Sequence, residues 1–126
     1  MRNEVPLTVQ LSQLGEYAVV AAAGSIDFST HELLEEELNR ALKLTRTAVI
    51  VDVADVTFCD STGLNAFVRA RRLATARGIV VVIAGLRDRV EYVFGITHLD
   101  RAFYSQPDTE TAIRWLENGS SARDTS

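Results

Sequence analysis

Runs of apolar residues divide the chain into segments with strand-like and helix-like patterns. Residues 7–14, LTVQLSQL, alternate in polarity, and residues 17–24, YAVVAAAG, follow after Gly15 and Glu16. Two such runs joined by a tight turn predict an antiparallel hairpin. Two later runs, AVIVDV at 48–53 and IVVVIAG at 79–85, are β-branched and show little alternation. This composition is typical of strands that are covered on both faces.

Segments with helical spacing separate these runs. Ser29 and Glu32 form a capping-box pattern, and the apolar residues that follow recur at helical spacing: Leu33, Leu34, Leu38, Ala41 and Leu42. Residues 63–78 carry a second apolar stripe and end at Gly78. We expect a third helix at 86–94, a short strand in RAFYS at 101–105, and a last helix that Asp108 caps and that ends at Leu116.

These segments predict the order β-β-α-β-α-β-α-β-α. A strand, a helix and a second strand imply a parallel pair with a right-handed crossover, so the sheet is mixed and the fold class is α/β. The 126 residues suit one domain, which we place at residues 4–117. The polar tail at 118–126 is expected to fray.

Composition and charge narrow the classes of function. The net charge of -4 and the pI near 5.1 argue against a nucleic-acid partner, which requires a clustered basic surface. No stretch is long and apolar enough to span a membrane, and MRNEVPLTVQ lacks the apolar core of a signal peptide, so we expect a cytoplasmic protein. One cysteine and two histidines give poor material for a metal site, and no cofactor is expected.

The stretch TFCDSTGL at 57–64 concentrates candidate chemistry between an apolar run and a helix. Ser61 has three interpretations: a helix cap, a nucleophile, or a phosphate acceptor. A hydrolase elbow needs Gly-x-Ser-x-Gly, and Cys59 stands at the first glycine position. A phosphate is plausible because unpaired N–H groups at a helix start favour an anion. Spacing alone favours the cap.

A phospho-accepting aspartate is a further alternative, with Asp52 or Asp55 as the acceptor. Its usual companions are missing, because no acidic pair follows an early strand. The only lysine, Lys43, ends the first predicted helix rather than a late strand. A nucleotide-binding domain or enzyme is also disfavoured, since the chain has neither Gly-x-Gly-x-x-Gly nor a P-loop.

Three segments in order resemble the STAS-domain anti-sigma factor antagonists. Asp60-Ser61-Thr62-Gly63-Leu64 resembles the phosphorylation corner of that family, Gly24-Ser25-Ile26-Asp27 resembles its Gly-x-Leu-Asp turn, and VEYVFGITHL resembles its late helix and turn. His98 departs from the pattern, because the family often has glycine there. This departure leaves the geometry of that turn open.

The resemblance implies a switch rather than an enzyme. The unmodified protein would bind an anti-sigma factor that is also a serine kinase, and would thereby free a sigma factor. The kinase would phosphorylate Ser61 and break the complex, and a metal-dependent serine phosphatase would restore it. Asp27 and Asp60 fall where the family has acidic residues beside the acceptor, so they are assigned to the kinase-facing site. We expect a monomer.

The second predicted helix supplies the rest of the partner-facing prediction. At 100° per residue, one exposed row carries Ser61, Asn65, Arg69 and Arg72, and the opposite side carries the apolar stripe. Thr62 and Gly63 complete the set around the acceptor. A solvated face with no partner is the alternative for this row. A STAS scaffold or transport-accessory domain without phosphorylation is the alternative for the whole protein.

Overall fold

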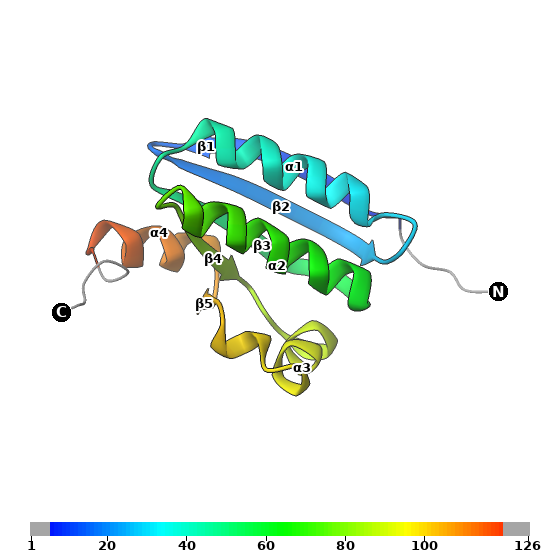
Figure 1. The fold of residues 1–126 in the computed structure, drawn as a ribbon. Coiled ribbons are helices and arrows are strands. Elements are labelled where there is room, and N and C mark those ends of the chain that lie inside the picture. The colour runs from blue at the N-terminus through cyan, green and yellow to red at the C-terminus, as the bar shows by residue number, and fades with distance from the viewer. Residues whose placement is uncertain (1–5, 120–126) are drawn as a thin grey trace.

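The computed structural model describes residues 6–119 and confirms the predicted order of elements. Figure 1 shows the helices stacked on the sheet. The elements are β1 (Thr8–Leu14), β2 (Tyr17–Ile26), α1 (His31–Leu44), β3 (Ala48–Cys59), α2 (Ser61–Ala76), β4 (Val80–Ala84), α3 (Asp88–Ile96), the 3-10 turn η1 (Leu99–Arg101), β5 (Tyr104–Gln106) and α4 (Thr109–Glu117). None of these helices is long and apolar enough to cross a membrane.

The five strands form one mixed sheet in the order β1-β2-β3-β4-β5. β1 and β2 are the antiparallel hairpin, and Gly15 takes a φ of 62° in its two-residue turn, a conformation that glycine adopts without strain. The remaining neighbours pair in parallel. The α/β fold with a mixed sheet and an N-terminal hairpin is therefore confirmed.

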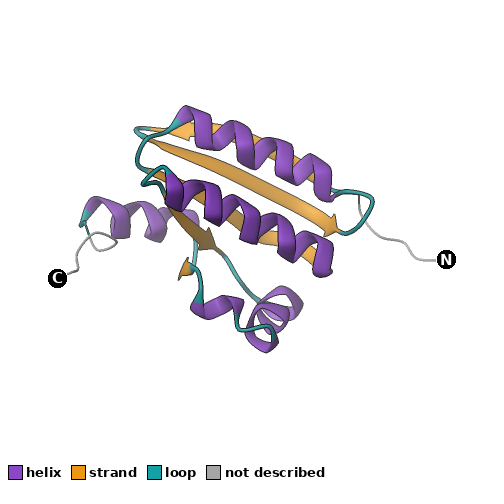
Figure 2. Ribbon diagram, in the orientation of Figure 1, coloured by secondary structure: helices purple, strands orange, loops and turns teal. Residues whose placement is uncertain are grey.

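Helices cover both faces of the sheet, as the continuous apolar strands predict. Alternate residues of β3 divide between the faces. Val49, Val51 and Val53 join the larger core under α1 and α2, whereas Ala48 and Ile50 join the smaller core under α4. Trp115 of α4 packs against this second core and lies 5.1 Å from the Tyr104 ring, centroid to centroid. Figure 2 shows α1 and α2 side by side on one face.

Several boundaries differ from the sequence prediction by a few residues, and those of β3 and α1 bear on the site. β3 continues to Cys59 rather than ending at Val53, because β2 supplies a partner as far as the Ile26 and Cys59 pair. Asp52 and Asp55 therefore lie within a strand. The N-cap of α1 is Thr30, and Ser29 forms no capping box, because its hydroxyl donates to Asp27 Oδ1 instead, at 2.7 Å.

Candidate functional site

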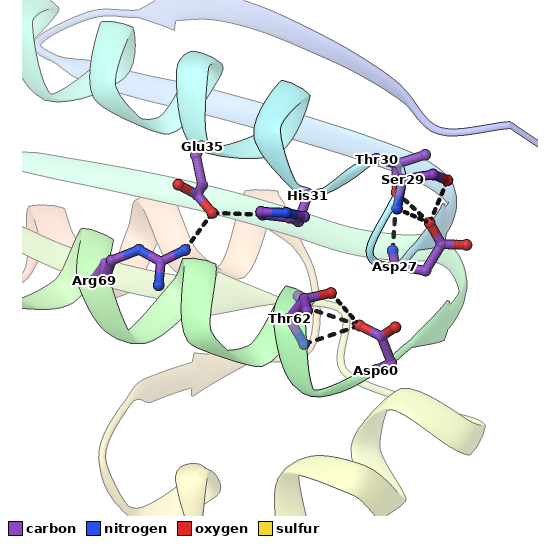
Figure 3. A network of polar contacts seen from close by, with 9 residues as sticks. Asp27, Ser29, Thr30, His31, Glu35, Asp60, Thr62 and Arg69 are labelled. Atoms are coloured by element: carbon purple, nitrogen blue, oxygen red, sulfur yellow. Dashed lines mark hydrogen bonds and ion pairs between the residues drawn. The ribbon is translucent and has the colours of Figure 1, made fainter.

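The corner between β3 and α2 is built around the carboxylate of Asp60. This residue is the N-cap of α2, and its Oδ1 accepts hydrogen bonds from the Thr62 and Gly63 N–H groups at 3.0 and 3.2 Å. The Thr62 hydroxyl donates to the same oxygen at 2.5 Å (Figure 3). The cap is therefore Asp60, not Ser61, and it already binds N–H groups that sequence alone left free for an anion.

The two hydroxyls that follow Asp60 have different surroundings. Ser61 is the first residue of α2 and is exposed, and its side chain makes no hydrogen bond within residues 6–119. Thr62 is half-buried and its hydroxyl is held by Asp60. A docking enzyme could reach the Ser61 oxygen without breaking a bond, whereas Thr62 would first have to leave its partner.

Gly63 is buried where α2 crosses the ends of β2 and β3. A Cβ atom there would lie 2.6 Å from Ile26 Cγ2 and 2.7 Å from Cys59 Sγ. The glycine therefore permits close packing of the helix on the sheet. Close packing alone is therefore a sufficient reason for a glycine at this position. Gly63 has no side chain with which to contact a partner protein. Burial also raises the pKa of the Cys59 thiol to about 12, which leaves it unreactive.

Asp27 organises the neighbouring loop between β2 and α1. Its Oδ1 accepts from the Ser29 N–H and hydroxyl at 2.9 and 2.7 Å, and from the Thr30 hydroxyl at 3.3 Å. The hydrogen bonds, with that of the Ser29 side chain foremost, hold the pKa of Asp27 below its ordinary value. The Asp60 N–H donates to the Ile26 carbonyl at 3.1 Å, so this loop and the start of α2 form one surface.

The exposed row of α2 divides into free and paired side chains. Ser61, Asn65 and Arg72 are exposed, as predicted. Arg69 is half-exposed, but its guanidinium donates to Glu35 of α1, which also bonds to His31 Nδ1 at 2.8 Å (Figure 3). Glu35 is thus half-buried and paired rather than free in solvent. It is a link between two helices.

Sequence reasoning missed Phe28, which is the most exposed large hydrophobic residue of the described chain. Its side chain is 77% exposed, and its ring lies 5.9 Å from that of His31, centroid to centroid. A single exposed hydrophobic side chain is common on protein surfaces, and this one is of interest because it follows Asp27 on the loop that is bonded to the start of α2. The signal was present in the stretch SIDFST, where one aromatic residue interrupts a polar turn.

The chemistry that this corner offers is that of a recognition surface with one free hydroxyl. His31, the histidine nearest in sequence to the Asp27 loop, is bonded to Glu35 rather than to Ser61. Within residues 6–119, no three His, Cys, Asp or Glu side chains are grouped so as to hold a metal ion. The corner thus presents one exposed hydroxyl, that of Ser61, which no other described side chain holds.

Comparisons with known proteins point to one family. The model of the STAS domain family matches residues 8–112. The chain is 27% identical over 104 residues to an anti-sigma-B factor antagonist of Staphylococcus aureus, covering 82% of this chain and 96% of the relative. It is 34% identical over 80 residues to an anti-sigma-B factor antagonist of Listeria monocytogenes, covering 64% of this chain and 70% of the relative.

The fold has also been observed in solved structures. An anti-sigma factor antagonist from Mycobacterium paratuberculosis superposes with a TM-score of 0.76 at 24% identity, covering 88% of this chain and 94% of that one. The family match spans both halves of the corner, from the Asp27 loop to α2, and continues into α4. The resemblance seen in three short segments thus extends over the domain, and the chain belongs to the STAS domain family.

Proposed function

We propose that this protein is an anti-sigma factor antagonist that phosphorylation of Ser61 switches off. The unphosphorylated form binds an anti-sigma factor that is also a serine kinase, and so releases a sigma factor. A metal-dependent serine phosphatase returns the modified form to the active pool. Because sigma factors act on transcription in the cytoplasm, the proposal places the protein there. The chain itself is a non-enzymatic member of its family, as expected.

One observation carries the proposal: the Ser61 hydroxyl is exposed and unbonded among the described residues, at the first position of a helix. The neighbouring hydroxyl of Thr62 is held by Asp60. The names of the relatives from Staphylococcus and Listeria support an anti-sigma factor as the partner. Ser61 is therefore the acceptor that we assign.

The Asp60 cap explains why a phosphate would act as a switch. A phosphoserine carries about 1.5 to 2 negative charges. At Ser61 it would stand beside a carboxylate that already bonds the Thr62 and Gly63 N–H groups. The phosphate therefore adds charge to the surface, because the N–H groups that could neutralise it at the helix start are already bonded to Asp60. A partner that fits the neutral hydroxyl would meet repulsion and a desolvation penalty.

The surface around Ser61 gives the partner its contacts in this proposal. It combines the Asp27 loop with the start and exposed row of α2, namely Asp60, Thr62, Asn65, Arg69 and Arg72. Phe28 stands on the same loop and supplies an apolar anchor. Gly63 contributes by letting the helix approach the sheet rather than by touching the partner.

The experiment uses the purified chain, its candidate anti-sigma factor and ATP, with the phosphate located by mass spectrometry. We expect phosphate on Ser61 in wild type and in Thr62→Val, and none in Ser61→Ala. Ser61→Ala should still bind the anti-sigma factor. Ser61→Asp should remain folded and bind at least about tenfold more weakly.

The alternative, a STAS scaffold or transport-accessory domain, makes a different prediction for the same samples. Such a domain would bind no anti-sigma factor and would take no phosphate at Ser61. Phosphate found mainly on Thr62, or equal binding by Ser61→Asp and wild type, would contradict the proposed switch.

A further inference from the structure

The outer edge of β1 lacks the features that normally prevent edge strands from pairing. β1 is one of the two edges of the sheet, and within residues 6–119 no strand lies beyond it. Its seven residues, TVQLSQL, include no charge and no proline, and its register with β2 runs without a bulge from Thr8 to Leu14. Natural edge strands usually carry at least one of these protections.

The free backbone groups of this edge are complementary to themselves. The hairpin closes on the Leu14 and Tyr17 pair, so alternate residues of β1 direct their N–H and C=O groups toward β2. Those of Val9, Leu11 and Gln13 point outward. If a second copy lies antiparallel with Leu11 opposite Leu11, then Val9 faces Gln13 of the other copy. All outward groups are then paired.

The flank of α1 above this edge has a matching symmetry. The opposite flank of α1 faces α2. Glu35 on that flank pairs with Arg69 of α2, and Asn39 lines a groove between the two helices. At 100° per residue, four residues therefore point away from α2 and past β1: Leu33, Glu37, Arg40 and Leu44. Leu33 and Leu44 are exposed by 38% and 46%, and Arg40 pairs with Glu37 at 3.6 Å.

Antiparallel pairing of β1 would place these four residues opposite one another. α1 runs in the same direction as β1, because Gln13 Nε2 donates to the Leu44 carbonyl at 3.1 Å, at the far end of both elements. Leu33 precedes Glu37 by as many residues as Leu44 follows Arg40. A two-fold axis near the middle of α1 thus brings each Leu33 to a Leu44, and each Glu37 to an Arg40, of the other copy.

The two axes fall at nearly the same level. Gln13, whose side chain bonds to the Leu44 carbonyl, lies about 7 Å along the strand from Leu11. Leu44 lies about 8 Å along the helix from the middle of α1. Each α1 packs over both β1 and β2 of its own copy. Because neighbouring strands lie about 4.8 Å apart, the two α1 helices would be about 10 Å apart, which is a normal packing distance.

We propose that two copies of this chain associate through β1, antiparallel about Leu11, to form one continuous sheet with α1 packed against α1. The expected occupant is a second copy because the strand edge is self-complementary in hydrogen bonding and the α1 flank is self-complementary in charge. The start of α2, whose first residue is Ser61, lies beyond the other flank of α1 and stays open (Figure 1). The sequence alone favoured a monomer, and its patterns do not reveal this edge.

Sedimentation equilibrium of the whole chain tests the proposal. Wild type should have twice the monomer mass of 13.9 kDa at about 100 µM. Gln10 and Ser12 are exposed and would face each other across the axis. Gln10→Lys with Ser12→Lys sets like charges opposite and should give a monomer, whereas Gln10→Lys with Ser12→Glu should keep the dimer.

Two further variants make the result decisive. Leu33→Lys with Leu44→Lys should weaken the dimer at least about tenfold. Leu73→Lys alters a leucine of similar exposure on α2 and should leave the mass unchanged. Circular dichroism checks that each variant folds; if the two-lysine β1 variant does not, the α1 pair decides. A monomeric wild type, a dimer that survives in a folded two-lysine variant, or loss of the dimer in the Lys and Glu variant would overturn the proposal.

Discussion

At the scale of single residues, two helical glycines have surroundings that predict opposite effects of one substitution. In Gly63→Ala the new methyl would meet Ile26 and Cys59 at under 3 Å, so we expect a loss of about 1–3 kcal/mol in unfolding free energy. Gly95 has no atom closer than 3.9 Å to the same position. Gly95→Ala should raise stability by about 0.5–1 kcal/mol. Urea unfolding measures both, and equal effects would contradict the packing account.

His98 provides a second test at a single residue. Its φ of 63° and ψ of 15° lie in the left-handed region, which disfavours residues with a Cβ atom. The turn therefore has the geometry that suits the glycine of the family. His98→Gly should raise the unfolding free energy by about 0.5–1 kcal/mol, and with it the melting temperature, because the left-handed strain is relieved. The exposed imidazole loses little packing when it is removed. His98→Val should lower it; if glycine destabilises the protein, the left-handed turn is not strained.

At the scale of elements, Glu35 ties α1 to α2 through Arg69, and it also bonds to His31 one turn earlier on its own helix. Burial raises the pKa of Glu35, but hydrogen bonds from His31 and Arg69 outweigh it and hold the pKa below the ordinary 4.5. A lowered carboxyl pKa stabilises the fold above 4.5, and this contribution is lost as pH falls through the folded-state pKa. Glu35→Gln should therefore be less stable than wild type near neutral pH. The difference should shrink in acid, and a gap that does not depend on pH would argue against this link.

The same link changes how the arginines of α2 should be tested. Arg69→Glu would set a second carboxylate beside Glu35, so it should lower the melting temperature as well as any affinity. Arg72 has no ion pair within residues 6–119, and Arg72→Glu alters the charge of the face alone. We expect Arg72→Glu to weaken binding to the anti-sigma factor without a change in melting temperature. If calorimetry gives an unchanged affinity, this part of α2 does not contact the anti-sigma factor.

At the scale of the whole molecule, the proposed partner surface joins a loop and a helix that are distant in sequence. Phe28 belongs to the first and Ser61 to the second. If both contact one partner, Phe28→Ala should reduce affinity by about 1–2 kcal/mol and leave the melting temperature unchanged. Leu73→Ala, at the other end of α2, is the matched control. Equal affinities for the two variants would confine the interface to α2.

The sequence by itself determined the features that depend on near neighbours along the chain. The hairpin follows from alternation around Gly15, and the cap of α4 from Asp108, whose carboxylate accepts from the Thr111 N–H at 2.7 Å. The helix stripes and the doubly covered strands follow from apolar spacing. The segment around Ser61 was located correctly at a strand-to-helix corner. All of these signals operate within a few residues, so local physics is sufficient to read them.

Only the tertiary structure decided the features that join distant segments. β3 extends to Cys59 because β2 lies beside it, Gly63 is buried because Ile26 arrives from another strand, and Glu35 meets Arg69 across two helices. No local pattern encodes these contacts, because each partner becomes available only when the chain has folded and brought its segments together.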